Sequence, residues 1–109
     1  MSENNRIHDM PSEDRPREKM LRHGAGALSG AELLAIFLRT GTKGASAIEI
    51  GRQLIQKYGS LAALGSVDIK QLSKEHGLGP AKSCQLLAAF ELGARAVRET
   101  IYKVPLSTP

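Results

Sequence analysis

The chain has 109 residues, of which 41% are hydrophobic, and a net charge of +4. This length suits one domain with its own apolar core and is too short for two. The single cysteine, Cys84, excludes an intramolecular disulfide and a cysteine-rich zinc site. The sequence has no apolar run of roughly 18 residues, the length a membrane span needs. We therefore expect a cytoplasmic protein with no membrane partner, whose mild basic charge permits an anionic one.

The N-terminal third begins without a periodic pattern. Residues 1–14 are polar and predict a flexible arm. Pro16 suits the first turn of a short helix, which Gly24 and Gly26 then end.

Two capping boxes mark the next helix starts. Ser29 and Glu32 frame the first box, which an apolar run follows, and Ser46 and Glu49 frame the second. In such a box the serine accepts a hydrogen bond from the amide three residues on, and the glutamate reaches back. The helix that the second box opens should end at Gly59.

The C-terminal half also reads as helical. Residues 60–65 can form one or two turns, and Ser66 can cap a short helix that Gly77 ends. Pro80 opens a long amphipathic helix that reaches about Arg98. Its apolar face should consist of Leu86, Phe90, Ala94 and Val97.

These elements predict an all-α fold, a small helical bundle of about five helices. Residues 15–99 form the helical domain, and residues 100–109, with two prolines, resemble the start of an interdomain linker. No segment alternates long enough to predict a strand.

The turn at residues 77–82, Gly-Leu-Gly-Pro-Ala-Lys, has the pattern of a helix-hairpin-helix. Its two glycines allow backbone angles closed to other residues and let a phosphate approach the amides. The helix N-terminus that follows favours an anion. The predicted DNA-binding residues are Gly77, Leu78, Gly79, Ala81 and Lys82. The alternative is a plain connection in which Leu78 is core and Lys82 is solvated.

Position 83 usually holds alanine in this type of hairpin, and here it is Ser83. Serine is small enough to fit. Its hydroxyl needs a hydrogen-bond partner if it is buried.

A second glycine-rich turn at residues 41–44 separates two predicted helices and could be a degenerate copy of the hairpin. It makes Arg39, Lys43 and Gly44 a candidate second phosphate site. A plain loop is the favoured interpretation of this weaker pattern.

Three segments together resemble the N-terminal domain of the bacterial RadC (UPF0758) proteins, over about Ile7 to Val97: Asp-Arg-Pro-Arg-Glu-Lys at 14–19, Leu-Ser to Leu-Arg-Thr-Gly-Thr at 28–42, and the turn at 77–82. The resemblance implies a helix-hairpin-helix domain that precedes a metal-dependent, peptidase-like domain of the JAB/MPN type. Zinc is expected only in that second domain, whose ligand set is missing here because His8, His23 and His76 are isolated. No catalytic residue, metal ligand or cofactor is predicted for this chain.

We thus expect a non-catalytic DNA-binding or DNA-targeting module of a RadC-like, DNA-repair-associated protein. It should contact the phosphates of duplex or branched DNA weakly, in a salt-sensitive way and without base specificity. The alternative is a protein-interaction module that positions the peptidase-like domain or recruits a protein partner.

Overall fold

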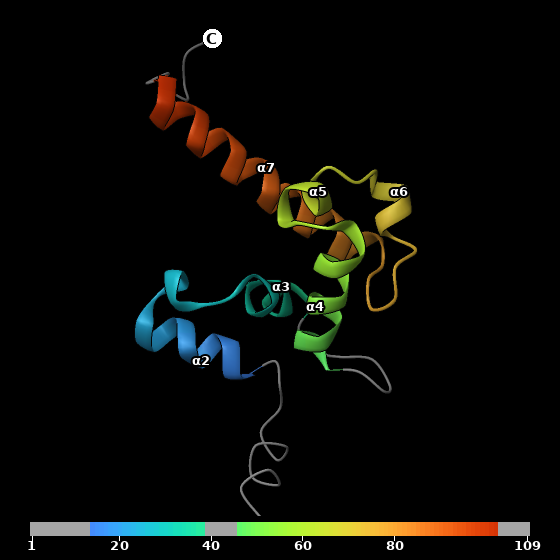
Figure 1. Cartoon of the computed structure of the whole chain (residues 1–109), viewed down its shortest axis with the longest axis horizontal. Helices are drawn as coiled ribbons and strands as arrows, with labels where there is room; N and C mark the ends of the chain where they lie inside the picture. Colours follow the sequence, from blue (N-terminus) through green and yellow to red (C-terminus); the bar gives the residue numbers. More distant parts are fainter. Residues whose placement is uncertain (1–13, 39–45, 103–109) are drawn as a thin grey trace, which may run out of the picture.

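The computed structural model describes residues 14–38 and 46–102. Within these ranges the chain forms six α-helices and one 3-10 turn, and no strand (Figure 1). The predicted all-α bundle is confirmed. The elements are α2 (Asp14–His23), η1 (Ala25–Ala27), α3 (Gly30–Leu38), α4 (Ala47–Tyr58), α5 (Leu61–Gly65), α6 (Ile69–Leu72) and α7 (Pro80–Tyr102).

The core lies between α3, α4 and the helices that follow them. Every helix from α3 to α7 contributes to one buried cluster, which comprises Leu34, Ala35, Leu38, Ala47, Ile50, Leu54, Leu64, Leu72 and Leu86. Helices α3 and α4 approach each other closely at Gly51. A Cβ atom added there would lie 2.8 Å from the carbonyl oxygen of Ala31. Only glycine therefore lets these two helices pack at this distance.

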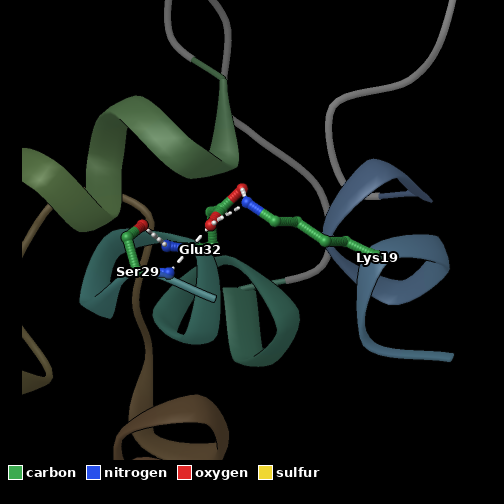
Figure 2. Close-up of polar contacts among 3 residues, drawn as sticks. All are labelled: Lys19, Ser29 and Glu32. Carbon is green, nitrogen blue, oxygen red and sulfur yellow. Dashed lines mark hydrogen bonds and ion pairs between the residues drawn. The ribbon is translucent and has the colours of Figure 1, made fainter. Parts of the chain in front are cut away.

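The two predicted capping boxes differ in the structure. In the first, the Glu32 amide donates to Ser29 Oγ at 3.1 Å and the Ser29 amide donates to Glu32 Oε1 at 2.8 Å, so both bonds form (Figure 2). In the second, Ser46 Oγ accepts from the Glu49 amide at 3.1 Å. The Glu49 carboxylate instead accepts hydrogen bonds from side chains farther along α4.

Glu32 also joins α3 to α2. Lys19 Nζ lies 3.2 Å from Glu32 Oε1 and 3.3 Å from Oε2 (Figure 2). The Ser29 amide, aided by the Lys19 ammonium and opposed by partial burial, holds the pKa of Glu32 below its ordinary value. Helix α2 is therefore joined to α3 by a carboxylate that also caps α3.

Some predicted boundaries need correction. Ser66 is not the cap of α6, because it closes α5, while Asp68 caps α6 by accepting from the Lys70 amide. The turns at 61–65 form a helix of their own, which gives six helices where about five were expected. Residues 1–13 of the predicted arm and 103–109 of the predicted linker lie outside the described residues.

The long helix α7 leaves the bundle partway along its length. Leu86 is buried and Phe90 is half-buried, whereas Ala94 and Val97 are exposed. The predicted core face is thus correct only for the first half of the helix. Figure 1 shows the rest of α7 extending away from the other helices to Tyr102, past the expected domain boundary at residue 99. None of the described helices combines the length and apolarity that crossing a membrane requires.

Candidate nucleic-acid interface

Residues 73–79 connect α6 to α7 in a short turn that is closed by backbone hydrogen bonds. The Leu78 amide donates to the carbonyl of Glu75 at 3.0 Å, and the Ser83 amide donates to the carbonyl of Gly79 at 2.9 Å. Leu78 is half-buried and packs against the core cluster. The turn is therefore anchored from inside, and α7 starts directly after Gly79.

The two glycines of the turn have different roles. Gly77 has φ of +87°, in the left-handed region, and a Cβ atom there would lie 2.9 Å from Ile50 Cδ1. Gly79 has no such angle, and a Cβ atom there would meet nothing within 4 Å. The expectation that both glycines supply special backbone angles is therefore wrong for Gly79. Gly77 is required by the fold, whereas Gly79 leaves open space beside the start of α7.

The N-terminus of α7 differs from those of α3, α4, α5 and α6. The starts of α3, α4, α5 and α6 are each capped by a side-chain oxygen, from Ser29, Ser46, Ser60 and Asp68 respectively. Gly79 has no side chain to offer, and the first turn of α7 carries no acidic residue. The first amide of α7 that donates within the helix is that of Ser83, so the amides of Ala81 and Lys82 before it have no intrahelical acceptor. The start of α7 therefore carries the positive end of the helix dipole, with no acidic side chain in its first turn.

Lys82 is not the free surface cation that its position in the motif suggested. Its half-buried ammonium donates to the carbonyl oxygen of Leu38, at the end of α3, over 2.7 Å. This contact satisfies a carbonyl that the helix itself leaves open, and it joins α7 to α3. An ammonium has further N–H donors, so the contact does not use up the hydrogen-bonding capacity of Lys82.

Two lysines beside the turn were missed by the motif analysis. Lys70 on α6 and Lys74 in the turn are both exposed. The acidic residue that follows Lys74 in the turn, Glu75, is paired with Lys57, whose Nζ lies 2.7 Å from Glu75 Oε2. Burial tends to raise the pKa of Glu75, but the hydrogen bonds from Lys57 and Tyr58 outweigh it and lower that pKa.

The charge around the turn is therefore positive in a way that sequence counting understates. A count of residues 70–82 sets three lysines against one glutamate, yet that glutamate already belongs to an ion pair with α4. The lysines of α6 and the turn were visible in the sequence. The partner of Glu75 lies 18 residues away in the chain, and only the fold brings it close.

The candidate second phosphate site, Arg39, Lys43 and Gly44, lies outside the described residues. Its sequence begins directly after Leu38, whose carbonyl contacts Lys82. The end of α3 and the start of α7 are thus neighbours in the bundle. The two-site arrangement stays a prediction.

Comparison with known proteins places the chain in one family. A family model described as UPF0758 N-terminal matches residues 7–84. A UPF0758 protein of Aeromonas hydrophila is 50% identical over 94% of this chain and 46% of its own length. One of Stutzerimonas stutzeri is 54% identical over 87% of this chain and 42% of its own length.

A UPF0758 protein of Methanococcoides burtonii is 50% identical over 83% of this chain and 39% of its own length. The chain spans about half the length of the curated relatives it matches. No solved structure matches it. The matched region contains the turn at 77–82, the helices α2 to α6 and the first residues of α7. The chain therefore belongs to the UPF0758 family, within the part that its family model describes as N-terminal.

Proposed function

We propose that the turn at residues 77–82 is a helix-hairpin-helix that binds the phosphate backbone of duplex or branched DNA without reading its sequence. The supporting observation is the start of α7, where Gly79 offers no side chain to cap the amides of Ala81 and Lys82, a Cβ atom at Gly79 would meet nothing within 4 Å, and the first turn carries no acidic residue. Amides at a helix N-terminus bind a phosphate oxygen through hydrogen bonds and through the helix dipole.

The surroundings favour nucleic acid over a small anion. Exposed Lys70 and Lys74 lie close along the chain to the open amides and can contact further phosphates. The chain has only four aromatic residues and no tryptophan, so base stacking on single strands has little support. Binding through phosphates alone should be weak and should fall steeply with salt concentration.

In the longer relatives such a module would be non-catalytic and would direct the remainder of the protein to DNA. The hydrolase-like chemistry that the resemblance implies, with its zinc, would belong to that remainder.

Gly79→Val tests the proposal with little disturbance of the fold, because the added side chain starts in open space. We expect at least roughly tenfold weaker binding to duplex and branched DNA, since the branched side chain blocks approach to the amides. Gly26→Val is the matched control, because a Cβ atom at Gly26 also meets nothing within 4 Å and this glycine is distant in sequence from the turn. It should bind DNA like the parent chain.

Titrations of duplex, branched and single-stranded DNA at two salt concentrations measure how much the charged side chains contribute to DNA affinity. The double variant Lys70→Ala/Lys74→Ala should reduce the slope of log affinity against log salt by about 2. If the folded Gly79→Val and double-lysine variants both bind like the parent, the turn is only a connection between helices. The protein-interaction alternative then becomes the better account.

A further inference from the structure

The second half of α7 carries large apolar side chains that no described residue covers. Val97 is 56% exposed and Ile101 is 64% exposed on one face of the helix, and Leu92 is 70% exposed on another. Isolated exposed apolar residues are common on protein surfaces, but a set aligned along one helix face marks a contact site.

Four residues form such a face, and we call them the α7 stripe: Phe90, Gly93, Val97 and Ile101. At about 100° per residue they fall within about 80° of one another, on the same side as buried Leu86. The stripe therefore continues the core face of α7 beyond the end of the bundle. Figure 1 shows this part of α7 extending away from the other helices.

The base of the stripe opens into an apolar groove between α3, α5 and α7. The groove has a volume of about 270 Å³, and its lining includes Leu33, Phe37, Leu61, Phe90 and Gly93. A Cβ atom at Gly93 would meet nothing within 4 Å, so another element can approach α7 closely there. Stripe and groove share Phe90 and Gly93 and form one continuous surface.

Another side of the same helix carries charged, solvent-exposed residues. Arg95 Nε lies 2.9 Å from Glu91 Oε2, and Arg98 Nη2 lies 3.7 Å from the same oxygen. These charged residues lie at larger angles from the centre of the stripe. The second half of α7 is thus amphipathic, with a polar side in solvent and an apolar side that no other described element covers.

The length of the relatives indicates what covers the stripe. The relatives are about twice as long as this chain, and the matching family model is described as N-terminal and ends at residue 84. Helix α7 continues past that point to Tyr102. In the longer proteins the remaining polypeptide therefore begins next to the stripe. Because this polypeptide is covalently joined to α7, its effective concentration at the stripe is raised, which favours docking within the chain over pairing with a second copy.

We propose that the α7 stripe and the adjoining groove form the docking surface for the part of the longer UPF0758 proteins that follows their N-terminal region. The docked part should present an apolar patch of its own, as interfaces between domains of one chain do. This inference does not depend on DNA binding by the turn at residues 77–82, which lies at the other end of α7.

Hydrogen exchange tests the docking directly. The exchange rates of the amides of residues 93–101 are compared between the 109-residue chain and a longer protein. In the longer protein these residues are followed by the C-terminal part of a UPF0758 protein. In the 109-residue chain they should exchange quickly at every protein concentration, because this helix segment has no tertiary cover. In the longer protein they should exchange at least roughly tenfold more slowly.

Substitutions then identify the face. Val97→Ser and Ile101→Ser in the longer protein should remove the added protection, whereas Leu92→Ser, an exposed position off the stripe, should keep it. Thermal melting of each 109-residue variant checks that the bundle stays folded. Equal exchange in both chains, or equal effects of all three substitutions, would overturn the proposal. Protection that grows with the concentration of the 109-residue chain would also overturn it, in favour of a second copy on the stripe.

Discussion

Ser83 offers the sharpest test of the packing at the start of α7. Its side chain is fully buried, and its hydroxyl has no hydrogen-bond partner among the described residues. A buried hydroxyl without a partner destabilises the folded state by about 1–3 kcal/mol, because it loses its hydrogen bonds to water on folding. Ser83→Ala removes that hydroxyl and also places a better helix former in α7.

The void left by one oxygen atom subtracts part of the gain. We therefore expect Ser83→Ala to raise the free energy of unfolding by about 1–2 kcal/mol. For a domain of this size each 1 kcal/mol corresponds to about 4–8 °C in melting temperature. Chemical denaturation followed by circular dichroism gives the free energy, and a thermal melt gives the second measure.

Ser46→Ala is the matched control, because it deletes a serine hydroxyl that does have a hydrogen-bond partner. Ser46 Oγ accepts from the Glu49 amide at the start of α4, so its loss should lower stability by about 1 kcal/mol. The reasoning fails if Ser83→Ala also lowers stability, because the hydroxyl would then have a partner that stabilises the fold.

Three further changes have expected outcomes. Gly51→Ala should lower stability by about 1 kcal/mol in spite of its better helix propensity, because α3 and α4 must separate; a rise in melting temperature would contradict this contact. Lys82→Ala should lower stability by about 1 kcal/mol, since it frees the Leu38 carbonyl, and an unchanged denaturation midpoint would show that the bond contributes nothing. The folded-state pKa of Glu32 is lowered, so its stabilisation is fully present above the pKa of the unfolded state and is lost as pH falls through the folded-state pKa. Acid titration of Glu32→Gln should therefore give a shallower loss of stability than the parent, and parallel curves would argue against a paired Glu32 carboxylate.

Local rules were sufficient for much of the fold. Serine and glutamate at Ser29 and Glu32 predicted a capping box, and both of its bonds form. Helix starts depend on atoms only a few residues apart, so a short window of sequence contains the interacting groups. The same holds for the left-handed glycine at Gly59, which ends α4 where the sequence placed the end. Ser66 was assigned wrongly because Asp68, two residues on, competes for the same role.

The candidate interface was only partly predictable. The pattern of the turn located it, but the pattern treated Gly77 and Gly79 alike. They differ because Gly77 alone has a left-handed φ and because Ile50 of α4 lies against Gly77 and not against Gly79. The bond between Lys82 and the Leu38 carbonyl joins residues 44 positions apart. No local window contains both partners of such a contact.

Helix α7 shows most clearly the difference between what the sequence predicts and what tertiary structure decides. Its sequence has one apolar face along its whole length, and periodicity predicts burial for every residue on that face. The structure buries Leu86 and leaves Val97 exposed, although both lie on the same face. Sequence by itself determined which segments are helical, most of their caps and the amphipathic pattern, because these follow from contacts between near neighbours. Tertiary structure alone decided where the bundle ends along α7, because burial depends on which other helices are long enough to reach that face.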